Sequence, residues 1–231
     1  MKTFYHRGSH GDIVYSMPSL KKLLASNLIL KNQNYFEFFE DLMLSQNYIK
    51  KVSHLDQPGI KWGDIDINLD AFRPINKKDR SKHLVYCHSE SIPVEVDLSE
   101  KWIEVEGQSS FPIVINRTKR YHDKQDIDWK ALKPLEDICQ FVGFEDEYSE
   151  FVKITGVRPS FLTCKNALEL ARIIAGSRLF VGNQSLGFAI AEGLKQNRVL
   201  EVCENQPNCT PITENGYTGK DLELAIEKYL S

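Results

Sequence analysis

The sequence predicts an α/β protein in which parallel sheets are flanked by helices. Short β-prone runs alternate with amphipathic segments of helical period along the whole chain, which is typical of parallel sheets covered on both faces. Two strand-to-helix junctions, at Gly8–Asp12 and at Gly182–Gly187, are glycine turns of the same kind. With 231 residues the chain is long enough for two small domains with buried cores.

The first part of the chain contains four β-prone runs. They are Lys2–Tyr5, Asn27–Leu30, Ile49–Val52 and Ile65–Leu69. The helix after the first strand places Ile13, Met17, Leu20 and Leu24 on one face. Pro18 lies inside it, so we expect either a kink there or a regular helix that begins near this residue. Further helices are expected at Tyr35–Leu44 and His83–Ser91, and Arg73–Lys82 is typical of a polar loop.

The alternation restarts near Gly107–Ser110, where we expect a boundary between an N-terminal domain (1–107) and a C-terminal domain (108–231). Strands of the second domain are predicted at Phe111–Asn116, Cys139–Val142, Phe161–Leu162, Arg178–Val181 and Arg198–Val202. Helices are predicted at Trp129–Leu135 (interrupted by Pro134), Glu145–Ile154, Ala167–Ala175, Leu186–Leu194 and Lys220–Leu230.

Composition excludes several classes of protein. The balance of 29 Lys and Arg against 32 Asp and Glu does not favour a nucleic-acid partner. No apolar run approaches the roughly 20 residues of a transmembrane segment, and the N-terminus lacks the apolar stretch of a secretion signal. The five cysteines are odd in number and widely spaced. Free thiols in a reducing cytoplasm explain them better than a zinc site or a disulfide framework.

The turn Gly182–Gly187 follows a buried strand and opens a helix. Free backbone N–H groups and the positive end of the helix therefore meet at the carboxyl edge of a sheet, where open α/β sheets bind ligands. We interpret the turn as the holder of the phosphates of a nucleotide-sugar. On this helix Phe188 and Glu192 lie opposite the core face formed by Leu186, Ala189, Ile190, Gly193 and Leu194. That side is either an exposed face or one wall of a cleft, with Phe188 beside base or sugar and Glu192 accepting ribose hydroxyls.

The loop Gly8–Asp12 is the second candidate for chemistry. Asp12 either caps the following helix or acts as a general base that takes the proton of an acceptor hydroxyl as its oxygen attacks a sugar carbon. His6 and His10 flank it, and each either binds an acceptor or is merely solvated. The pair Asp64 and Asp66 resembles a metal-binding motif, but alternating carboxylates of this kind are usually the wet face of an edge strand, so no metal site is expected.

The loop after Asn116 is the third candidate. Its cations, Arg117, Lys119 and Arg120, together with the Thr118 hydroxyl, follow a predicted buried strand. Such groups can neutralise and bond a diphosphate leaving group. The alternative is a solvated basic loop.

These loops together resemble a glycosyltransferase family, the one that includes the bacterial ADP-heptose:lipopolysaccharide heptosyltransferases. The segment Gly11–Leu20 is similar to the family's opening Gly-Asp-hydrophobic and Leu-Pro-Ala run. Arg117–Arg120 followed by Trp129, then Phe141–Tyr148, resemble the start of its donor-binding domain. Leu179–Ser185 resembles its donor-phosphate turn. Residues 30–105 carry little of the resemblance.

The resemblance implies the GT-B architecture, in which two Rossmann-like domains face a cleft with the acceptor on the first and the nucleotide on the second. It implies an inverting, metal-independent transferase with no cofactor, whose substrates are a nucleotide-diphosphate-sugar donor and a small or glycan hydroxyl acceptor. Asp12 is then the base. The acceptor-binding residues expected are His6, Arg7, Ser9, His10 and Gly11. The donor-binding residues expected are Thr118, Lys119, Arg120, Tyr121, Gly182, Asn183, Gln184, Ser185, Leu186, Gly187, Phe188 and Glu192.

Two departures from the family are visible. The chain is shorter than typical members, mostly in the acceptor-side domain. In the phosphate turn it has Asn183, Gln184 and Phe188 where the family commonly has Asp, Thr and His. The resemblance therefore leaves the sugar and base open. Two alternatives also stay open, a nucleotide-sugar epimerase or hydrolase of GT-B fold and a non-catalytic nucleotide-binding module.

Overall fold

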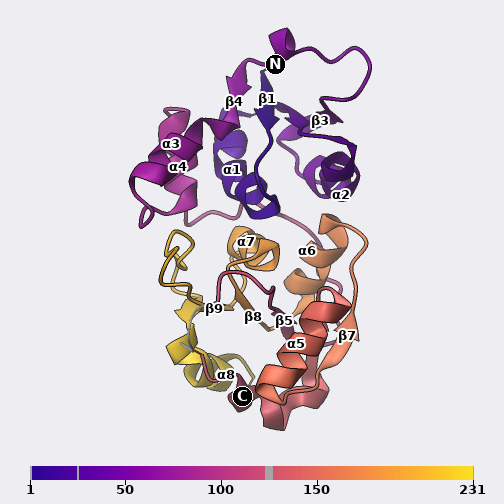
Figure 1. The fold of residues 1–231 in the computed structure, drawn as a ribbon, viewed down its shortest axis with the longest axis vertical. Coiled ribbons are helices and arrows are strands. Elements are labelled where there is room, and N and C mark those ends of the chain that lie inside the picture. Colours follow the sequence, from indigo (N-terminus) through magenta and orange to yellow (C-terminus); the bar gives the residue numbers. More distant parts are fainter. Residues whose placement is uncertain (1, 25, 123–126, 231) are drawn as a thin grey trace.

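The computed structural model describes residues 2–24, 26–122 and 127–230. Two parallel sheets lie one above the other with helices packed between them (Figure 1). The first sheet has the order β3-β2-β1-β4 and consists of β1 (Thr3–His6), β2 (Ser26–Leu30), β3 (Ile49–His54) and β4 (Ile67–Asn68). The predicted α/β class with two Rossmann-like domains is confirmed.

The second sheet has the order β10-β9-β8-β5-β6-β7. Its strands are β5 (Ile113–Asn116), β6 (Cys139–Val142), β7 (Ser160–Leu162), β8 (Leu179–Asn183), β9 (Arg198–Glu201) and β10 (Gly216–Thr218). The order reverses between β5 and β8, and in the first sheet between β1 and β4. In doubly wound sheets ligands bind in the crevice at such a switch point. Each domain thus has one, at the ends of β5 and β8 and at the ends of β1 and β4.

Helices α1 (His10–Leu23), α2 (Gln33–Leu44), α3 (Phe72–Lys78) and α4 (Leu84–Ser91) belong to the first sheet. The α1 helix begins at His10, so the alternative of a helix starting near Pro18 is wrong. Leu24 is 72% exposed and lies just beyond the helix. The predicted loop Arg73–Lys82 is also wrong in its first part, because α3 covers it and packs the buried Phe72 into the core.

The second sheet is covered by α5 (Glu145–Thr155), α6 (Ala167–Gly176), α7 (Leu186–Leu194) and α8 (Leu222–Leu230). The short helix predicted at Trp129 is a 3-10 helix, Trp129–Ile138, with Pro134 inside it. The edge strand β10 was not predicted, since three residues around a glycine give no recognisable period. The predicted strand Ile65–Leu69 is reduced to the two residues of β4.

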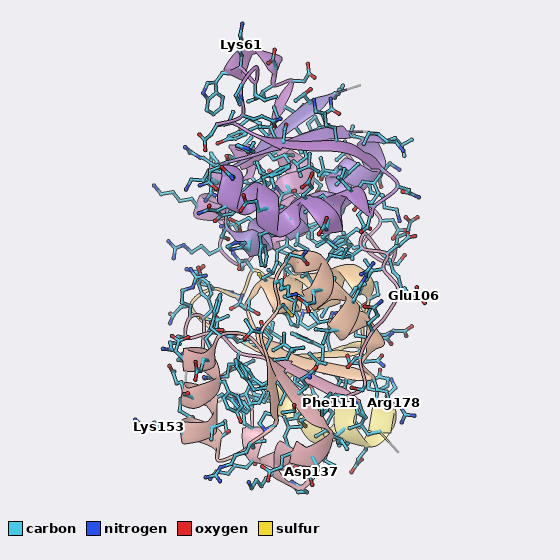
Figure 2. The ribbon with its side chains drawn as sticks, turned by 90° about the vertical axis from the view of Figure 1, so that its right-hand side faces the viewer. Lys61, Glu106, Phe111, Asp137, Lys153 and Arg178 are labelled. Atoms are coloured by element: carbon cyan, nitrogen blue, oxygen red, sulfur yellow. The ribbon has the colours of Figure 1, made fainter. Side chains whose placement is uncertain are left out.

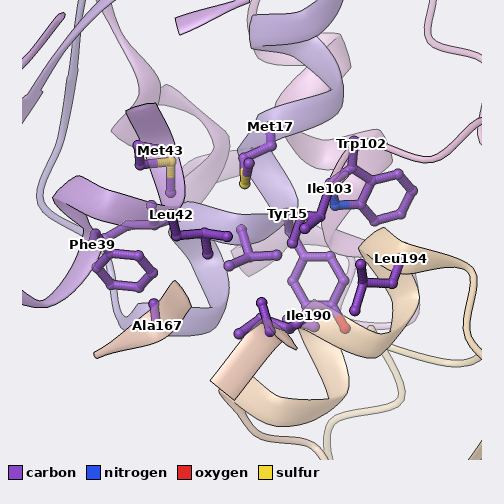
Figure 3. Close-up of a cluster of buried hydrophobic side chains, with 14 of the residues drawn as sticks. Tyr15, Met17, Phe39, Leu42, Met43, Trp102, Ile103, Ala167, Ile190 and Leu194 are labelled. Atoms are coloured by element: carbon purple, nitrogen blue, oxygen red, sulfur yellow. The ribbon is translucent and has the colours of Figure 1, made fainter. Parts of the chain in front are cut away.

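One apolar core runs through both domains. Helix α1 packs on α7, and α2 packs on α6. Figure 3 shows the junction, where Tyr15 and Leu42 of the first domain meet Ala167, Ile190 and Leu194 of the second. All five side chains are buried. The two sheets are therefore held by a continuous hydrophobic contact, which fixes the crevice between their carboxyl edges.

The segment between α4 and β5 connects the domains and lies along the second one. The backbone N–H groups of Trp102 and Ile103 donate to the carbonyl of Gly193 at 3.0 and 3.1 Å. In Figure 2 Glu106 lies at the side of the molecule and Phe111 lies lower, beside the second sheet. The predicted boundary at residues 107 and 108 falls inside this segment.

Membrane spans and disulfides, both considered from the composition, can be compared with the structure. Among the residues that the structure describes, no helix is long and apolar enough to cross a membrane. No disulfide joins the five cysteines, all of which lie in the described ranges.

Candidate functional site

A cavity of about 750 Å³ opens between the two domains, at both switch points. Its lining from the first domain is Ser9, His10, Gly11, Asp12, Tyr15, Phe38, Phe72, Arg73, Asn76 and Leu84. The lining from the second domain includes Asn116, Thr118, Lys119, Arg120, Tyr121, Phe144, Gln184, Ser185, Leu186 and Gly187. The three loops selected from the sequence thus meet in one place. A Cβ added to Gly11 would lie 4.0 Å from the Ser185 carbonyl oxygen, so the two glycine turns nearly touch.

Asp12 lies in the first turn of α1 and is both a cap and a cavity residue. Its Oδ2 accepts the backbone N–H of Ser9 at 3.0 Å, and its side chain is 16% exposed. The Arg73 guanidinium lies 3.6 Å from the same oxygen. Both contacts use Oδ2, and Asp12 lines the cavity. The geometry is therefore compatible with both predictions for Asp12, a cap of α1 and a general base.

Asp70 binds Arg73 and fixes its position. Its Nε donates to Asp70 Oδ1 at 3.1 Å, and Asp70 Oδ2 accepts the backbone N–H of Arg7 at 3.2 Å. Asp70 is 7% exposed. Arg73 and Asp70 thus tie the loop after β1 to the segment after β4 and orient the carboxylate of Asp12. The sequence analysis missed both residues because it assigned their segment to a strand end and a loop.

His6 lies beneath the loop and does not reach the cavity. It is fully buried, and its Nδ1 accepts the backbone N–H of Gly8 at 2.8 Å. Burial lowers its pKa to about 4, so the ring is neutral at pH 7. His88, whose pKa burial also lowers, lies 5.4 Å away ring to ring. His6 supports the loop, and Arg7, also expected to bind an acceptor, points outward with its side chain 61% exposed.

His10 lies at the cavity wall in an aromatic cluster. Its ring is stacked on Tyr35 and nearly parallel to it, with centroids 4.7 Å apart and 7° between planes, and Phe38 meets it edge-on at 5.2 Å. Burial, and then the charge of Arg120, lower the pKa of His10. His10 is therefore a neutral, aromatic part of the wall that the first domain contributes to the cavity.

The phosphate turn is built around Asn116 at the end of β5. Its Oδ1 accepts the Ser185 hydroxyl at 2.7 Å, and its Nδ2 donates to the Val142 carbonyl at 2.6 Å. A Cβ on Gly187 would lie 2.6 Å from Asn116 Oδ1, and one on Gly182 would lie 2.5 Å from its carbonyl oxygen. These glycines are thus required by close packing, while Ser185 caps α7. Leu186 and Gly187, whose N–H groups have no partner within the helix, both line the cavity.

Asn183 organises the cationic loop rather than lining the cavity. Its Nδ2 donates to the carbonyls of Thr118 and Arg120 at 2.9 and 2.5 Å, and its Oδ1 accepts the Thr118 N–H at 3.0 Å. The side chain is fully buried. An aspartate there would turn a carboxylate oxygen toward two carbonyl oxygens. The asparagine at position 183 therefore has a structural reason, because its amide holds the conformation of residues 118–120.

Two of the three cations of this loop line the cavity. Lys119 contacts Asp146 at 2.7 Å, which raises its pKa, and both side chains are largely exposed. Arg120 lies 5.4 Å from the ring of Tyr121. Arg117 instead forms a buried two-point ion pair with Glu201, at 2.7 and 3.1 Å. An exposed pair contributes little, so Lys119 can exchange Asp146 for a phosphate at small cost.

The cleft-facing position predicted for Phe188 and Glu192 is wrong. Both are fully buried, because α7 is enclosed between the two domains and is apolar nearly all round. Glu192 bonds Arg198 at 2.7 Å through one oxygen and Lys195 at 2.8 Å through the other. Its carboxylate is saturated by cations of its own chain and is not available to a ribose.

The loop after β9 closes the cavity and was not predicted. Gln206, Asn208 and Cys209 line it. Asn208 Nδ2 donates to Asn76 Oδ1 at 3.0 Å, and its carbonyl accepts the N–H of Leu84 at 2.9 Å. Gln184 Nε2 donates to the Gln206 carbonyl at 2.5 Å. Contacts between residues this far apart leave no local signal in the sequence.

Among the described residues, no group of three or more His, Cys, Asp and Glu is arranged to hold a metal ion.

Comparison with known proteins finds similar ones by structure alone. No family model and no curated protein matches the sequence. The crystal structure of a glycosyl transferase family 9 protein from Veillonella parvula is similar with a TM-score of 0.61 and 12% identity, over 94% of this chain and 85% of that one. Heptosyltransferase WaaC of E. coli, solved with ADP, is similar with a TM-score of 0.59 and 12% identity, over 99% and 97% of the two chains.

A third similar structure is the E. coli ADP-heptose lps heptosyltransferase II, with a TM-score of 0.60 and 11% identity, over 100% of this chain and 98% of that one. At such low identity the likeness establishes the fold. The resemblance to heptosyltransferases drawn from the sequence motifs is thus confirmed at the level of the fold by an independent comparison.

Proposed function

We propose that the protein is an inverting glycosyltransferase that moves a sugar from a nucleotide-diphosphate-sugar to a hydroxyl acceptor. The observation that carries this proposal is the interdomain cavity, with the carboxylate of Asp12 on one wall and the α7 N-terminus and cationic loop on the other. A transferase of similar fold supports it, since E. coli heptosyltransferase WaaC is described both with ADP and with ADP-2-deoxy-2-fluoro heptose.

In the proposed reaction the acceptor O–H gives its proton to Asp12 while the acceptor oxygen forms a bond to the anomeric carbon. The bond from that carbon to the diphosphate oxygen breaks on the opposite face, and the nucleoside diphosphate leaves with the electron pair. Lys119, Arg120 and the N–H groups of Leu186 and Gly187 stabilise the charge of the leaving group. These charges do the work that a metal ion does in other transferases, so we propose a metal-independent reaction.

The donor-side roles are assigned by position. Thr118, Lys119, Arg120 and Tyr121 line the cavity beside Ser185–Gly187 and are proposed to contact the diphosphate and its substituents. Asn183 and Gly182 act indirectly. Asn183 holds the loop that carries Thr118, and Gly182 allows close packing against Asn116. Gln184 lines the cavity beside them and bonds the loop after β9.

On the acceptor side Ser9, His10 and Gly11 line the cavity around Asp12, and we propose that they contact the acceptor. His6 and Arg7 do not line it, and we propose that they hold the loop in place. We also propose that Arg73 and Asp70 position the carboxylate of Asp12.

The test compares Asp12→Asn with Asp137→Asn, an exposed carboxylate at the far end of the second domain (Figure 2). Purified variants are incubated with a panel of nucleotide-sugars and hydroxyl acceptors, and released nucleoside diphosphate and glycoside product are measured. Asp12→Asn should lower turnover roughly 100-fold and leave nucleotide binding intact, while the control keeps full activity. Full turnover in Asp12→Asn would exclude a base at this position. Product without acceptor would indicate an epimerase or hydrolase, and nucleotide binding with no turnover in the unchanged protein would indicate a non-catalytic module.

A further inference from the structure

We propose that the acceptor is an uncharged carbohydrate, which packs a ring face on the aromatic wall of the first domain and presents a hydroxyl to Asp12. This inference rests on the proposed function and names the acceptor class of that site. It follows from how the positive charge of the acceptor-side wall is distributed and from which side chains make up the rest of that wall.

The cation in the described acceptor-side lining is Arg73, and two carboxylates already engage it. Its Nε bonds Asp70 at 3.1 Å, and its Nη2 lies 3.6 Å from Asp12. An anionic acceptor would have to compete with a nearly buried carboxylate for this guanidinium. Arg7 is the second cation of this cluster, with its Nε 3.4 Å from Asp70 Oδ2. Two guanidinium groups and two carboxylates therefore balance each other, and the cluster has no net positive charge with which to attract an anion.

The other usual anion binders of this wall are engaged as well. The positive end of α1 is capped by Asp12, whose Oδ2 accepts the N–H of Ser9 at 3.0 Å. The imidazole of His10 is in its neutral form at pH 7, since burial lowers its pKa. The acceptor side therefore differs from the donor side, where Lys119, Arg120 and the α7 N-terminus face the same cavity.

Aromatic and amide side chains form the remaining wall. The half-buried Phe38 lines the cavity, and His10 is stacked on Tyr35 beside it. Asn76 adds an amide that bonds Asn208 at 3.0 Å. Flat apolar surfaces with a few polar groups fit a sugar ring, whose C–H face packs on an aromatic ring while its hydroxyls point outward.

The experiment measures binding of matched probes by saturation-transfer NMR and calorimetry, without nucleotide. The probes are methyl glycosides of glucose, galactose and mannose, each against the corresponding sugar 6-phosphate. We expect at least one neutral glycoside to bind, and to bind roughly tenfold more tightly than its 6-phosphate, a difference of about 1.4 kcal/mol. Preference for the 6-phosphates, or no binding of any glycoside, would overturn the proposal.

Two variants test its physical basis. Phe38→Ala should abolish glycoside binding, while Phe36→Ala, which removes a half-buried ring of the same helix that packs on His54 outside the cavity, should keep it. Asp70→Asn removes one carboxylate partner of Arg73 and should raise the relative affinity for the 6-phosphates by several fold. An unchanged preference in Asp70→Asn, or loss of binding in both phenylalanine variants, would refute the account of this wall.

The outcomes separate this inference from the proposed function. Nucleoside diphosphate binding is measured on the same samples. A protein that binds nucleotides and 6-phosphates but no neutral glycoside loses the inference and keeps the proposed function. A protein that binds neutral glycosides and no nucleotide loses the proposed function.

Discussion

Replacing Asn183 with aspartate changes one buried atom, from a donor to an anionic acceptor. The amide Nδ2 of Asn183 donates to the carbonyls of Thr118 and Arg120 at 2.9 and 2.5 Å. In Asn183→Asp an oxygen would take its place and face both carbonyl oxygens at similar separations. The loop must then move away, and it carries the two cations assigned to the diphosphate.

The cost can be worked from these contacts. Two hydrogen bonds are lost, each about 1 kcal/mol, and one oxygen of a buried carboxylate is left without a donor while the other still accepts the Thr118 N–H, which brings the total to about 3 to 5 kcal/mol. In a protein of this size, each kcal/mol lowers the melting temperature by roughly 2 to 4 °C. Asn183→Asp should therefore melt roughly 6 to 20 °C below the unchanged protein. Asn183→Ala loses the bonds without burying a charge and should melt at an intermediate temperature.

The assay is thermal unfolding together with calorimetric titration of a nucleoside diphosphate. Asn183→Asp should also weaken nucleotide binding by at least about tenfold, because the loop no longer presents Lys119 and Arg120. Asn197→Asp is the matched control, since its Nδ2 makes one exposed bond to the Arg178 carbonyl at 2.9 Å. A stable Asn183→Asp variant that binds nucleotide normally would refute the role assigned to this amide.

Three other outcomes follow from the structure. Burial lowers the pKa of His83 to about 4, below the unfolded value, so the stability it contributes is complete above pH 6.5 and falls by up to about 3 kcal/mol between pH 6.5 and 4. His6 and His88, whose pKa values burial also lowers, add to the same slope. Urea unfolding against pH should show this slope, and His83→Asn, which keeps an N-cap on α4, should reduce it. Gly187→Ala should cost about 1 to 3 kcal/mol because its Cβ would lie 2.6 Å from Asn116 Oδ1, whereas Gly63→Ala, with nothing within 4 Å, should be neutral in the same melting assay. Ile190→Ala should lower the free energy of unfolding by about 2 to 5 kcal/mol while keeping a single transition, and two separate transitions would contradict a shared core.

The elements that the sequence predicted well are those with strong periodic patterns. The glycine turns at Gly11 and Gly182 follow buried strands, and their place at the carboxyl edge follows from parallel topology alone. For that reason the sequence alone predicts that Asp12, Ser185 and the loop after Asn116 lie at one site, and all of them line the cavity.

The residues that were missed depend on contacts between distant parts of the chain. Arg73 lies on a short polar helix whose role is set by Asp70 and Asp12, and nothing in its neighbours indicates that pairing. Asn208 reaches the cavity through a bond to a residue more than a hundred positions away.

The error on α7 has a different cause. A helix enclosed by two domains buries its polar side too, so the rule that places polar residues in a cleft or in solvent fails there. Glu192 is tolerated at that position because Arg198 and Lys195 neutralise it. Lys195 is the C-cap residue of α7, three positions after Glu192, so this pair was within reach of the sequence, whereas Arg198 lies on the next strand.

The central claim is that the interdomain cavity binds a nucleoside diphosphate, and thermal unfolding in the presence of a nucleotide and nucleotide-sugar panel tests it most directly. A ligand at about 100 times its dissociation constant stabilises the folded state by about 2.7 kcal/mol, which should raise the melting temperature by roughly 5 to 11 °C. The double variant Lys119→Ala with Arg120→Ala should lose most of this rise. If no nucleotide raises the melting temperature, or if the double variant responds as fully as the unchanged protein, the cavity is not the donor site described above.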